Sequence, residues 1–397
     1  MEQNLSLYLH IPFCVRKCLY CDFLSGPQSA GVQEQYVEAL CREIQETSPE
    51  YREYQVVSVF IGGGTPSVLL PEQTIRIMET LKSCFTLTDT CEISMEMNPG
   101  TVTPEKMNAY RTCGINRISI GLQSANDGEL KALGRIHTCA DFLKAYEMAV
   151  EAGFTNINVD LMSAIPEQTL KSYQETLQKV LALQPQPVHI SAYSLIVEEG
   201  TPFYEQELNL PDEETERRMY EITDDILRKA GYHRYEISNY ALPGRECRHN
   251  RVYWKRGNYV GFGLGAASMV ENVRFENTRK MQEYLAEYAG VPGAEPVSAD
   301  VAQGDMQQIF RGENVHPLSP QEQMEETMFL GLRLTEGVSK AEFHRQFGVS
   351  MEQIYGKVIQ ENIVQGLLAD EAGYVRLTRE GMDLSNYVMA QFLLDEV

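Results

Sequence analysis

Apolar segments with strand character alternate with amphipathic helical segments over the first 230 residues of the chain. The strand-like segments are rich in β-branched residues and fall at 5–11, 55–61, 91–97, 116–122, 155–162 and 187–194. They are followed by helical patterns over about 32–44, 71–81, 104–111, 140–152, 169–183 and 212–230. Such alternation is typical of parallel strands joined by crossover helices. Six successive units predict an α/β fold with a partial (β/α)6 barrel, similar to part of a TIM barrel.

The pattern changes after Tyr232. An irregular strand is expected over 232–241, with a turn at Pro243 and Gly244. The segment 291–320 is rich in Gly, Pro and Gln, which is typical of a loop or linker.

Helical patterns return beyond the linker, over 322–334, 339–349 and 350–368. A hairpin is expected around Gly373, and a last helix is expected to end near Leu394. Helices followed by a hairpin outline a winged-helix-like α+β domain. We therefore expect three parts: a partial barrel over 1–235, an extension with a linker over 236–315, and the winged-helix-like domain over 316–397.

The charge balance argues against nucleic acid as a partner. Asp and Glu number 56 against 34 Lys and Arg, for a formal net charge of −22. Such a chain repels phosphate backbones unless basic residues gather locally, and no stretch of the sequence gathers them. The helix at 350–368 has one Lys and two Glu, whereas a DNA-reading helix is basic. The C-terminal domain is therefore expected to be structural or to dock a partner.

The cysteines are expected to be reduced. The N-terminus lacks the pattern of a signal peptide, and no run reaches the roughly 18 apolar residues of a membrane span, so we expect a cytoplasmic protein. Disulfides are rare in that compartment, and clustered cysteines there point to metal or redox chemistry. Five of the nine cysteines are scattered through apolar segments and are expected to be small core residues: Cys41, Cys84, Cys91, Cys113 and Cys139.

Three cysteines, Cys14, Cys18 and Cys21, lie in the loop after the first strand. Three thiolates in one short loop can bind three irons of a cubane cluster and leave the fourth iron open to a small molecule. Zinc is the alternative, with His10 as fourth ligand. His10 falls inside the predicted strand, an awkward place from which to fold back. We therefore favour the cluster and expect His10 to form hydrogen bonds beneath the site.

Polar residues follow the other predicted strands. "GGGTPS" (62–67) follows the second strand, Glu96 and Asn98 end the third, Gln123 ends the fourth, and Asp160 lies in the fifth. Each could singly be a solvated loop residue. Because the carboxyl ends of barrel strands meet at one face, together they predict a site for a ligand with an ammonium, a carboxylate and ribose hydroxyls.

The motifs "YLHIPFCVRKCLYCDF", "GGGTPS", "SMEMNPGT", "RISIGLQS", "LGRIHT" and "NVDLMSAIPEQT" resemble the radical S-adenosylmethionine (radical SAM) enzymes, in their oxygen-independent coproporphyrinogen III oxidase-like group. The resemblance runs over about 5–255, with a similar C-terminal domain. It implies that Cys14, Cys18 and Cys21 bind a [4Fe–4S] cluster whose open iron is chelated by S-adenosylmethionine (SAM). It implies that eight residues hold SAM: Tyr8, Gly63, Gly64, Thr65, Glu96, Gln123, Arg135 and Asp160. Pattern reasoning alone does not indicate Arg135.

Within that group, the sequence resembles a heme-chaperone branch. The porphyrinogen-oxidising enzymes have a further cysteine where this chain has Phe23, and a longer segment before the motif. "CRHNRVYW" (247–254) resembles the H-N-x-x-Y-W motif of the heme-chaperone branch, which is linked to heme handling. Heme contact is therefore expected from His249 as an axial ligand and from Tyr253 and Trp254 by stacking, with Cys247 a weaker candidate ligand. Alternatively, the motif simply closes the bottom of the domain, and related chaperones often have a His where this chain has Ala267.

Three functions remain open. A heme chaperone would bind cluster, SAM and heme and deliver heme to acceptor proteins, for which respiratory membrane proteins would fit. A radical enzyme would act on a porphyrin, either decarboxylating a porphyrinogen or modifying heme. A zinc-stabilised structural protein would contain no iron. We prefer the chaperone, do not expect coproporphyrinogen dehydrogenase activity, and leave open whether SAM is cleaved and whether the chain is a monomer or a homodimer.

Overall fold

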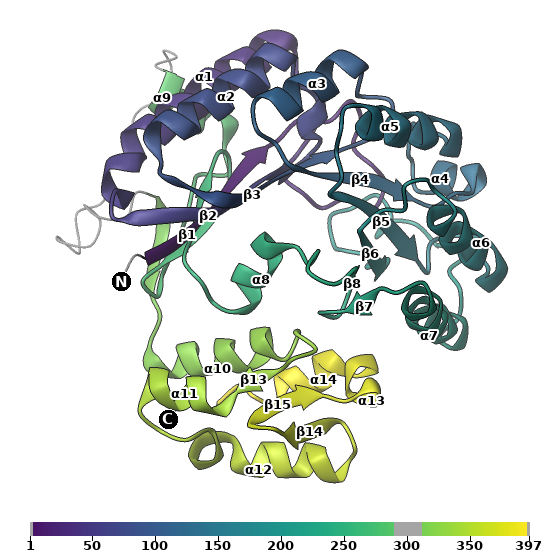
Figure 1. Cartoon of the computed structure of the whole chain (residues 1–397), viewed down its shortest axis with the longest axis vertical. Helices are drawn as coiled ribbons and strands as arrows, with labels where there is room; N and C mark the ends of the chain where they lie inside the picture. Colours follow the sequence, from purple (N-terminus) through teal and green to yellow (C-terminus); the bar gives the residue numbers. More distant parts are fainter. Residues whose placement is uncertain (1–2, 290–311, 395–397) are drawn as a thin grey trace.

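The computed structural model describes residues 3–289 and 312–394. In this part of the chain, a large sheet has the strand order β12-β11-β10-β9-β1-β2-β3-β4-β5-β6-β8-β7. Its middle six strands are parallel and lie in sequence order: β1 (Gln3–Ile11), β2 (Tyr54–Gly63), β3 (Leu87–Met97), β4 (Arg117–Gln123), β5 (Ile157–Ser163) and β6 (His189–Ser194). The sheet curves without closing, because β6 pairs with β8 instead of returning to β1. The predicted partial (β/α)6 barrel is confirmed (Figure 1).

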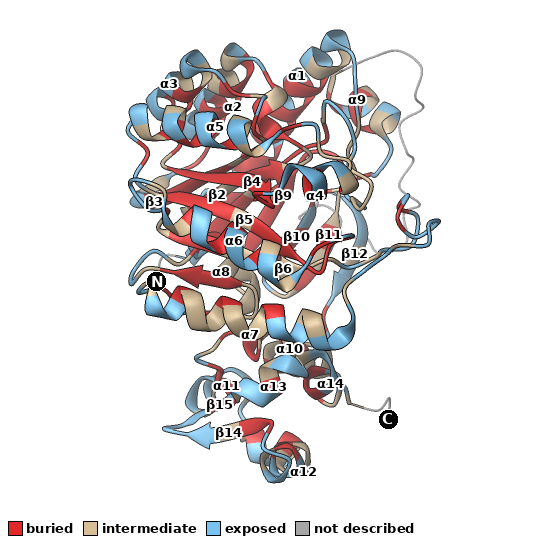
Figure 2. Cartoon of the chain, turned by 90° about the vertical axis from the view of Figure 1, so that its right-hand side faces the viewer, coloured by how far each residue is buried: buried red, intermediate tan, exposed pale blue. Residues whose placement is uncertain are grey.

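The outer face of this sheet is covered by helices. They are α1 (Ala30–Thr47), α2 (Pro71–Cys84), α3 (Pro104–Thr112), α4 (Asp127–Ala132), α5 (Cys139–Glu151), α6 (Leu170–Leu181) and α7 (Glu213–Lys229), with 3-10 turns η1 (Ser48–Tyr51) and η2 (Pro66–Val68). Several begin at a side chain that accepts a backbone N–H, such as Thr103, Thr138 and Thr169. The middle strands of the sheet are largely buried, and every residue of β4 is buried (Figure 2).

The two faces of the barrel strands differ in chemistry. On β1, the leucines Leu5, Leu7 and Leu9 belong to the main apolar core, whereas Ser6 and His10 alternate with them. Polar residues on neighbouring strands are buried in the same way: Ser58, Glu92, Ser119, Asn158 and His189. The concave side of the sheet is therefore polar, and this side positions the site.

Strands are added at both edges of the barrel. β9 (Tyr259–Phe262) is parallel to β1, and β10 (Ala267–Val270), β11 (Val273–Glu276) and β12 (Glu313–Pro317) follow in antiparallel order. β8 (Asn239–Ala241) and β7 (His233–Arg234) extend the other edge.

The predicted loop over 291–320 is wrong at its end, because β12 pairs with β11 and a helix begins at Pro320. The strand was missed because its residues are mostly polar and exposed, as expected at a sheet edge. Residues 291–311 of that segment lie outside the described residues.

The C-terminal part has its own sheet and core. It contains α10 (Pro320–Gly331), β13 (Val338–Ser339), α11 (Lys340–Phe347), α12 (Met351–Val364), β14 (Leu368–Glu371), β15 (Tyr374–Leu377), α13 (Arg379–Asp383) and α14 (Ser385–Ala390). Its strands pair in the order β13-β15-β14, and its core includes Phe343, Tyr355 and Phe392. The winged-helix-like outline is confirmed. The last helix is two short helices that end at Ala390, because Leu384 between them leaves helical geometry.

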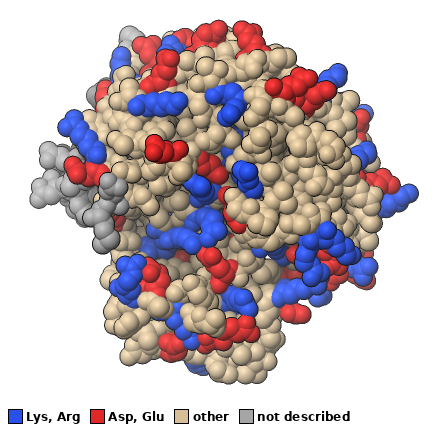
Figure 3. All heavy atoms as spheres, viewed as in Figure 1, with Lys and Arg blue, Asp and Glu red and all other residues tan. Residues whose placement is uncertain are grey.

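A short helix, α8 (Arg248–Trp254), lies between the concave side of the sheet and the C-terminal domain, and α9 (Met281–Ala289) packs against α1 (Figure 1). Lys and Arg side chains gather near the boundary between the two parts (Figure 3). Salt bridges join the parts there: Arg251 and Lys255 pair with Glu336, and Arg256 and Arg274 pair with Glu326. Among the described residues, no helix is both long and apolar enough to span a bilayer.

Candidate cluster and nucleotide site

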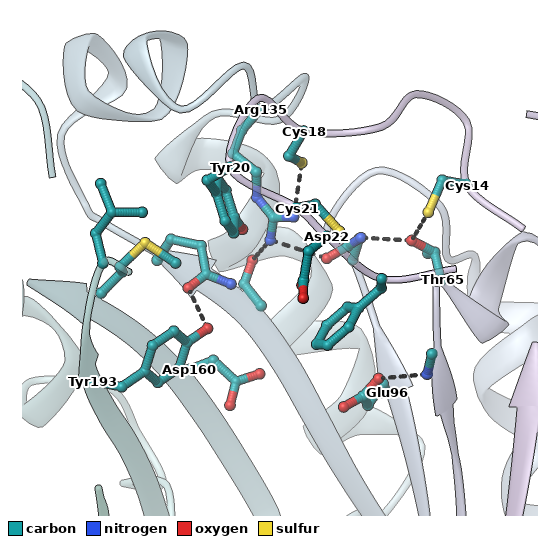
Figure 4. A pocket seen from close by; sticks show the side chains of 18 of the residues that line it. Cys14, Cys18, Tyr20, Cys21, Asp22, Thr65, Glu96, Arg135, Asp160 and Tyr193 are labelled. Carbon is teal, nitrogen blue, oxygen red and sulfur yellow. Dashed lines mark hydrogen bonds between the residues drawn. The ribbon is translucent and has the colours of Figure 1, made fainter. Parts of the chain in front are cut away.

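The cysteine loop between β1 and α1 is held on both sides by backbone hydrogen bonds. Gly64 and Thr65 donate to the carbonyls of Ile11 and Phe13 at 2.9 and 2.7 Å, and Leu19 donates to Leu133 at 3.2 Å. Cys14, Cys18 and Cys21 on this loop are free and half-buried. The three thiols are therefore presented at the carboxyl end of the barrel strands, as predicted (Figure 4).

The glycines at the end of β2 are required by packing of the protein itself. Gly63 has a φ of 108°, and a Cβ there would lie 2.6 Å from the His10 ring. A Cβ on Gly64 would lie 2.6 Å from the Phe13 carbonyl oxygen and 3.0 Å from Cys14 Sγ. The "GGG" segment thus allows the cysteine loop to lie directly on β2.

A pocket of about 340 Å³ opens beside the cysteine loop. Its lining brings together most of the residues predicted for the cluster and for SAM: Cys14, Cys18, Cys21, Gly63, Gly64, Thr65, Glu96, Gln123, Arg135 and Asp160. In Figure 4 the cysteines lie on the loop, with Glu96 and Asp160 facing them from the strands. The volume falls within the range of small-molecule sites.

Arg135 joins the cysteine loop to the strands. Its Nη1 donates to Cys18 Sγ at 3.5 Å, and its Nη2 donates to Gly121 O at 2.8 Å and to Asn98 Oδ1 at 3.0 Å. Its Nε is buried and has no hydrogen-bond partner among the described residues. A buried guanidinium N–H without an acceptor favours an anionic ligand group nearby.

Two carboxyl groups face the pocket from β3 and β5. Glu96 Oε2 accepts the Gly63 N–H at 3.2 Å, and burial followed by the nearby Asp160 raises the pKa of Glu96 to about 8. Burial also raises the pKa of Asp160, against hydrogen bonds from Ser119 and Asn158 that lower it. A cationic ligand group would relieve this crowding of negative charge.

Tyr8 and His10 lie beneath the cysteine loop. Tyr8 is the one predicted SAM residue that the described lining of the pocket does not include. Its hydroxyl is 3.0 Å from His10 Nδ1, and His10 Nε2 is 2.9 Å from the Leu24 carbonyl oxygen. Both nitrogens of His10 are thus hydrogen-bonded within the protein, which confirms the expectation for His10.

Sequence reasoning missed two tyrosines in the pocket wall, Tyr20 and Tyr193. The Tyr193 hydroxyl donates to Gln123 Oε1 at 3.1 Å. Gln123 itself has a φ of 70° at an irregularity in the pairing of β4 with β5, which turns its side chain into the pocket. Tyr193 could have been found by extending the strand-end rule to β6.

The H-N-x-x-Y-W motif forms α8, and its residues face two ways. His249 is 1% exposed and faces the barrel, with Nδ1 3.0 Å from Ser58 Oγ and Nε2 2.8 Å from the Tyr253 hydroxyl. Burial lowers the pKa of His249 to about 3, so the ring is neutral. Trp254 instead stacks beneath Arg333 of the C-terminal part, with 4.3 Å from Arg333 Cζ to the ring centre. Cys247 is buried, and its Sγ is 3.6 Å from Glu92 Oε1.

Trp254 also lines a second cavity of about 420 Å³, between α8 and the C-terminal domain. Lys255, Glu336 and Tyr374 are further lining residues. The indole Nε1 of Trp254 is buried and has no hydrogen-bond partner among the described residues. The motif therefore contributes to two separate environments.

The cysteine loop presents three free thiols, the number that a cubane cluster with one open iron requires. Within residues 3–289 and 312–394, no three His, Cys, Asp or Glu side chains converge as ligands of one metal ion. Thiolates on a cubane bind different irons, so they need not converge on one point. Burial raises the pKa of the Cys21 thiol. Binding of a metal centre would lower this pKa again, because the thiolate is the form that binds metal.

Comparison with known proteins agrees with this geometry. The model of the radical SAM superfamily matches residues 8–180, and that of the HemN C-terminal domain matches residues 318–384. Among solved structures, coproporphyrinogen III oxidase (HemN) from Escherichia coli has a TM-score of 0.81 at 22% identity, covering 99% of this chain and 90% of that chain. The fold and the cysteine loop thus define a radical SAM protein.

Curated relatives place the chain more narrowly. The heme chaperone HemW of Lactococcus lactis subsp. lactis is 36% identical over 401 residues, covering 100% of this chain and 99% of the relative. The HemW proteins of Bacillus subtilis and Escherichia coli are 36% identical over 393 residues and 33% identical over 392 residues. The former match covers 98% of this chain and 99% of the relative, the latter 98% of each. The chain belongs to the HemW family, which confirms the predicted branch.

Proposed function

We propose that the chain binds a [4Fe–4S] cluster through Cys14, Cys18 and Cys21, binds SAM in the adjoining pocket, and carries heme to acceptor proteins. The single observation that carries the first two parts is the convergence of three free cysteines, Arg135 and Glu96 on one pocket. The third part rests on membership of the HemW family.

The residues of the pocket suit the groups of SAM. The guanidinium of Arg135, with its unpartnered Nε, suits a carboxylate. The Glu96 carboxyl suits an ammonium, and Gln123 and Asp160 suit ribose hydroxyls. When bound, the cluster supplies the one-electron chemistry of the superfamily, while these residues orient the nucleotide and limit the access of water.

For heme, we propose His249 as the axial ligand with Tyr253 in contact. Contact with Trp254, which faces the C-terminal domain, further requires that its side chain turn or that heme extend into the second cavity. His249 is neutral, as iron ligation requires, but both its nitrogens are hydrogen-bonded. Ligation through Nε2 therefore requires that the Tyr253 hydroxyl release the ring. Under this proposal, Tyr253→Phe binds heme at least as tightly as the wild type, and His249→Ala loses the spectrum of His-ligated heme.

The test is an anaerobic hemin titration of reconstituted protein, followed by visible spectra, for the wild type and for Tyr253→Phe, His249→Ala and Trp254→Phe. Tyr259→Phe, a change of a neighbouring buried tyrosine, is the matched control for Tyr253→Phe. An unchanged spectrum in His249→Ala removes His249 from the heme site. A loss confined to Trp254→Phe points instead to the cavity between α8 and the C-terminal domain.

The second candidate function is that of a radical enzyme acting on a porphyrin, which the fold shared with HemN favours. Coproporphyrinogen III incubated with reduced protein and SAM distinguishes the two. The chaperone is expected to release no protoporphyrinogen, whereas the enzyme forms it together with 5′-deoxyadenosine.

We further propose that the protein is cytoplasmic, that it is a monomer or a homodimer, and that its heme acceptors include respiratory membrane proteins. We also propose that the chain divides into functional parts at 1–235, 236–315 and 316–397.

A further inference from the structure

A line of buried polar side chains runs beneath the pocket, from Asp160 on β5 to the start of α8. The Asp160 carboxylate accepts hydrogen bonds from Asn158 Nδ2 at 2.7 Å and from Ser119 Oγ at 2.9 Å. Asn158 Oδ1 lies 2.6 Å from Nδ1 of His189 on β6, and His189 Nε2 lies 2.9 Å from the Tyr235 hydroxyl. Asn158, His189 and Tyr235 are 3%, 1% and 4% exposed.

The chemistry of these groups gives the line one direction. The NH2 group of Asn158 donates to Asp160, so the oxygen of Asn158 faces His189 and accepts from it. The Nδ1 of His189 then carries the hydrogen, and Nε2 accepts the Tyr235 O–H. Burial, with the nearby Arg117, lowers the pKa of His189 well below its usual range, which agrees with a neutral ring holding one hydrogen. Each donor therefore points toward Asp160.

The far end of the line lies at α8. The Tyr235 hydroxyl accepts the backbone N–H of Cys247, the residue before the helix, at 3.3 Å. The Tyr235 carbonyl accepts the backbone N–H of Thr335, between α10 and β13, at 3.0 Å. Tyr235 thus touches the barrel interior, the start of α8 and the C-terminal part at once.

We propose that His189 and Tyr235 are positioning residues that orient the Asp160–Asn158 pair for the nucleotide and tie it to the first turn of α8. This inference rests on the proposed binding of SAM near Asp160. A ligand hydroxyl that donates to Asp160 binds the same carboxylate that accepts the hydrogen bond from Asn158. Ligand binding therefore changes the strength of the hydrogen bonds that follow, as far as Cys247. The two ends of the line are therefore energetically coupled.

The experiment uses the reconstituted full-length protein and two readouts. SAM affinity is measured by equilibrium dialysis in the wild type, Tyr235→Phe, His189→Leu and His189→Gln. Tyr235→Phe removes one hydroxyl and leaves His189 Nε2 without its donor, so the affinity should fall about tenfold. The SAM affinity of His189→Leu should fall at least as far. His189→Gln keeps a donor and an acceptor in sequence and should restore most of the affinity. Iron content and the visible spectrum should stay unchanged in all variants.

Trp254 provides the second readout, because it is the one tryptophan of the chain and ends α8. Saturating SAM should change the Trp254 emission of the wild type, and this change should be absent in Tyr235→Phe. Tyr173→Phe is the matched control, since the buried Tyr173 hydroxyl forms one hydrogen bond, to Thr223 at 2.9 Å, away from the pocket. It should bind SAM and respond as the wild type does.

The outcomes separate the two proposals. If the wild type with an intact cluster does not bind SAM, the proposed function and the positioning role of His189 and Tyr235 both fail. If the wild type binds SAM, and Tyr235→Phe and His189→Leu bind it equally well, the positioning role fails and the proposed function stands. If affinity falls but SAM leaves the wild-type Trp254 emission unchanged, the tie to α8 is overturned.

Discussion

The pocket at the mouth of the barrel and His249 on α8 both offer polar groups to a ligand, but these groups differ in how they are hydrogen-bonded. At the mouth, Arg135 has a buried Nε without a partner, and Glu96 has a strongly raised pKa beside an open pocket. At α8, both nitrogens of His249 are hydrogen-bonded and the ring is stacked on Phe60, with 5.2 Å between ring centres. The pocket at the mouth is open to a ligand, whereas ligation at His249 requires existing hydrogen bonds to break.

The largest expected effect is at the cysteine loop. Replacing any one of Cys14, Cys18 and Cys21 with Ser should abolish the cluster, because each thiolate binds a separate iron. Iron and sulfide analysis after anaerobic reconstitution measures this. Cys139→Ser, a half-buried cysteine on α5, should retain full iron content. A cluster retained in all three single variants would contradict the proposal that these cysteines bind it.

Arg135→Lys tests the mouth next. A lysine ammonium cannot reproduce the bonds to Cys18, Gly121 and Asn98 and still reach a ligand, so SAM affinity should fall at least about tenfold. Equilibrium dialysis measures the affinity, and Arg76→Lys on the surface of α2 should leave it unchanged. Wild-type affinity in Arg135→Lys would mean that the unpartnered Nε is not a ligand contact.

Stability should respond more strongly at α8 than at the pocket wall. His249→Ala removes a buried ring and leaves Ser58 and Tyr253 without a partner, so the heme-free protein should lose about 2–4 kcal/mol. Gln123→Ala at the pocket wall should cost about 1 kcal/mol, because it removes one hydrogen bond, from Tyr193, at an open pocket where water can replace it. Urea unfolding compares the two. Equal losses would contradict the distinction between the regions.

The smallest expected effect is a change in pH dependence. The pKa of Glu96 is raised from 4.5 to about 8, so between these values the folded state binds more protons than the unfolded state. Stability from this group is therefore lost as pH rises from about 4.5 to about 8. Glu96→Gln should reduce the decrease of the unfolding free energy with pH, which unfolding of SAM-free protein at several pH values measures. Part of the slope should remain, because burial raises the pKa of Glu43 to about 7. An unchanged slope would contradict the assigned burial of Glu96.

The barrel was predictable from the sequence because parallel strands have strong local patterns, and the cysteine loop because its spacing is local. Residues that meet only through tertiary packing were not predictable in this way. Arg135 lies 117 residues from Cys18 and was indicated by family resemblance alone. The polar edge strand β12 has no alternation of apolar residues that would have indicated a strand. Within α8, His249 faces β2 and Trp254 faces the C-terminal part, and these orientations depend on neighbours far away in the sequence.

The most direct measurement is the electron paramagnetic resonance spectrum of the reduced, reconstituted protein with and without SAM. An open iron beside the pocket predicts a cluster signal that changes when SAM is added, and Arg135→Lys should need more SAM for the same change. A protein that contains no iron and sulfide, or an intact cluster whose signal is the same with and without SAM, would contradict the account.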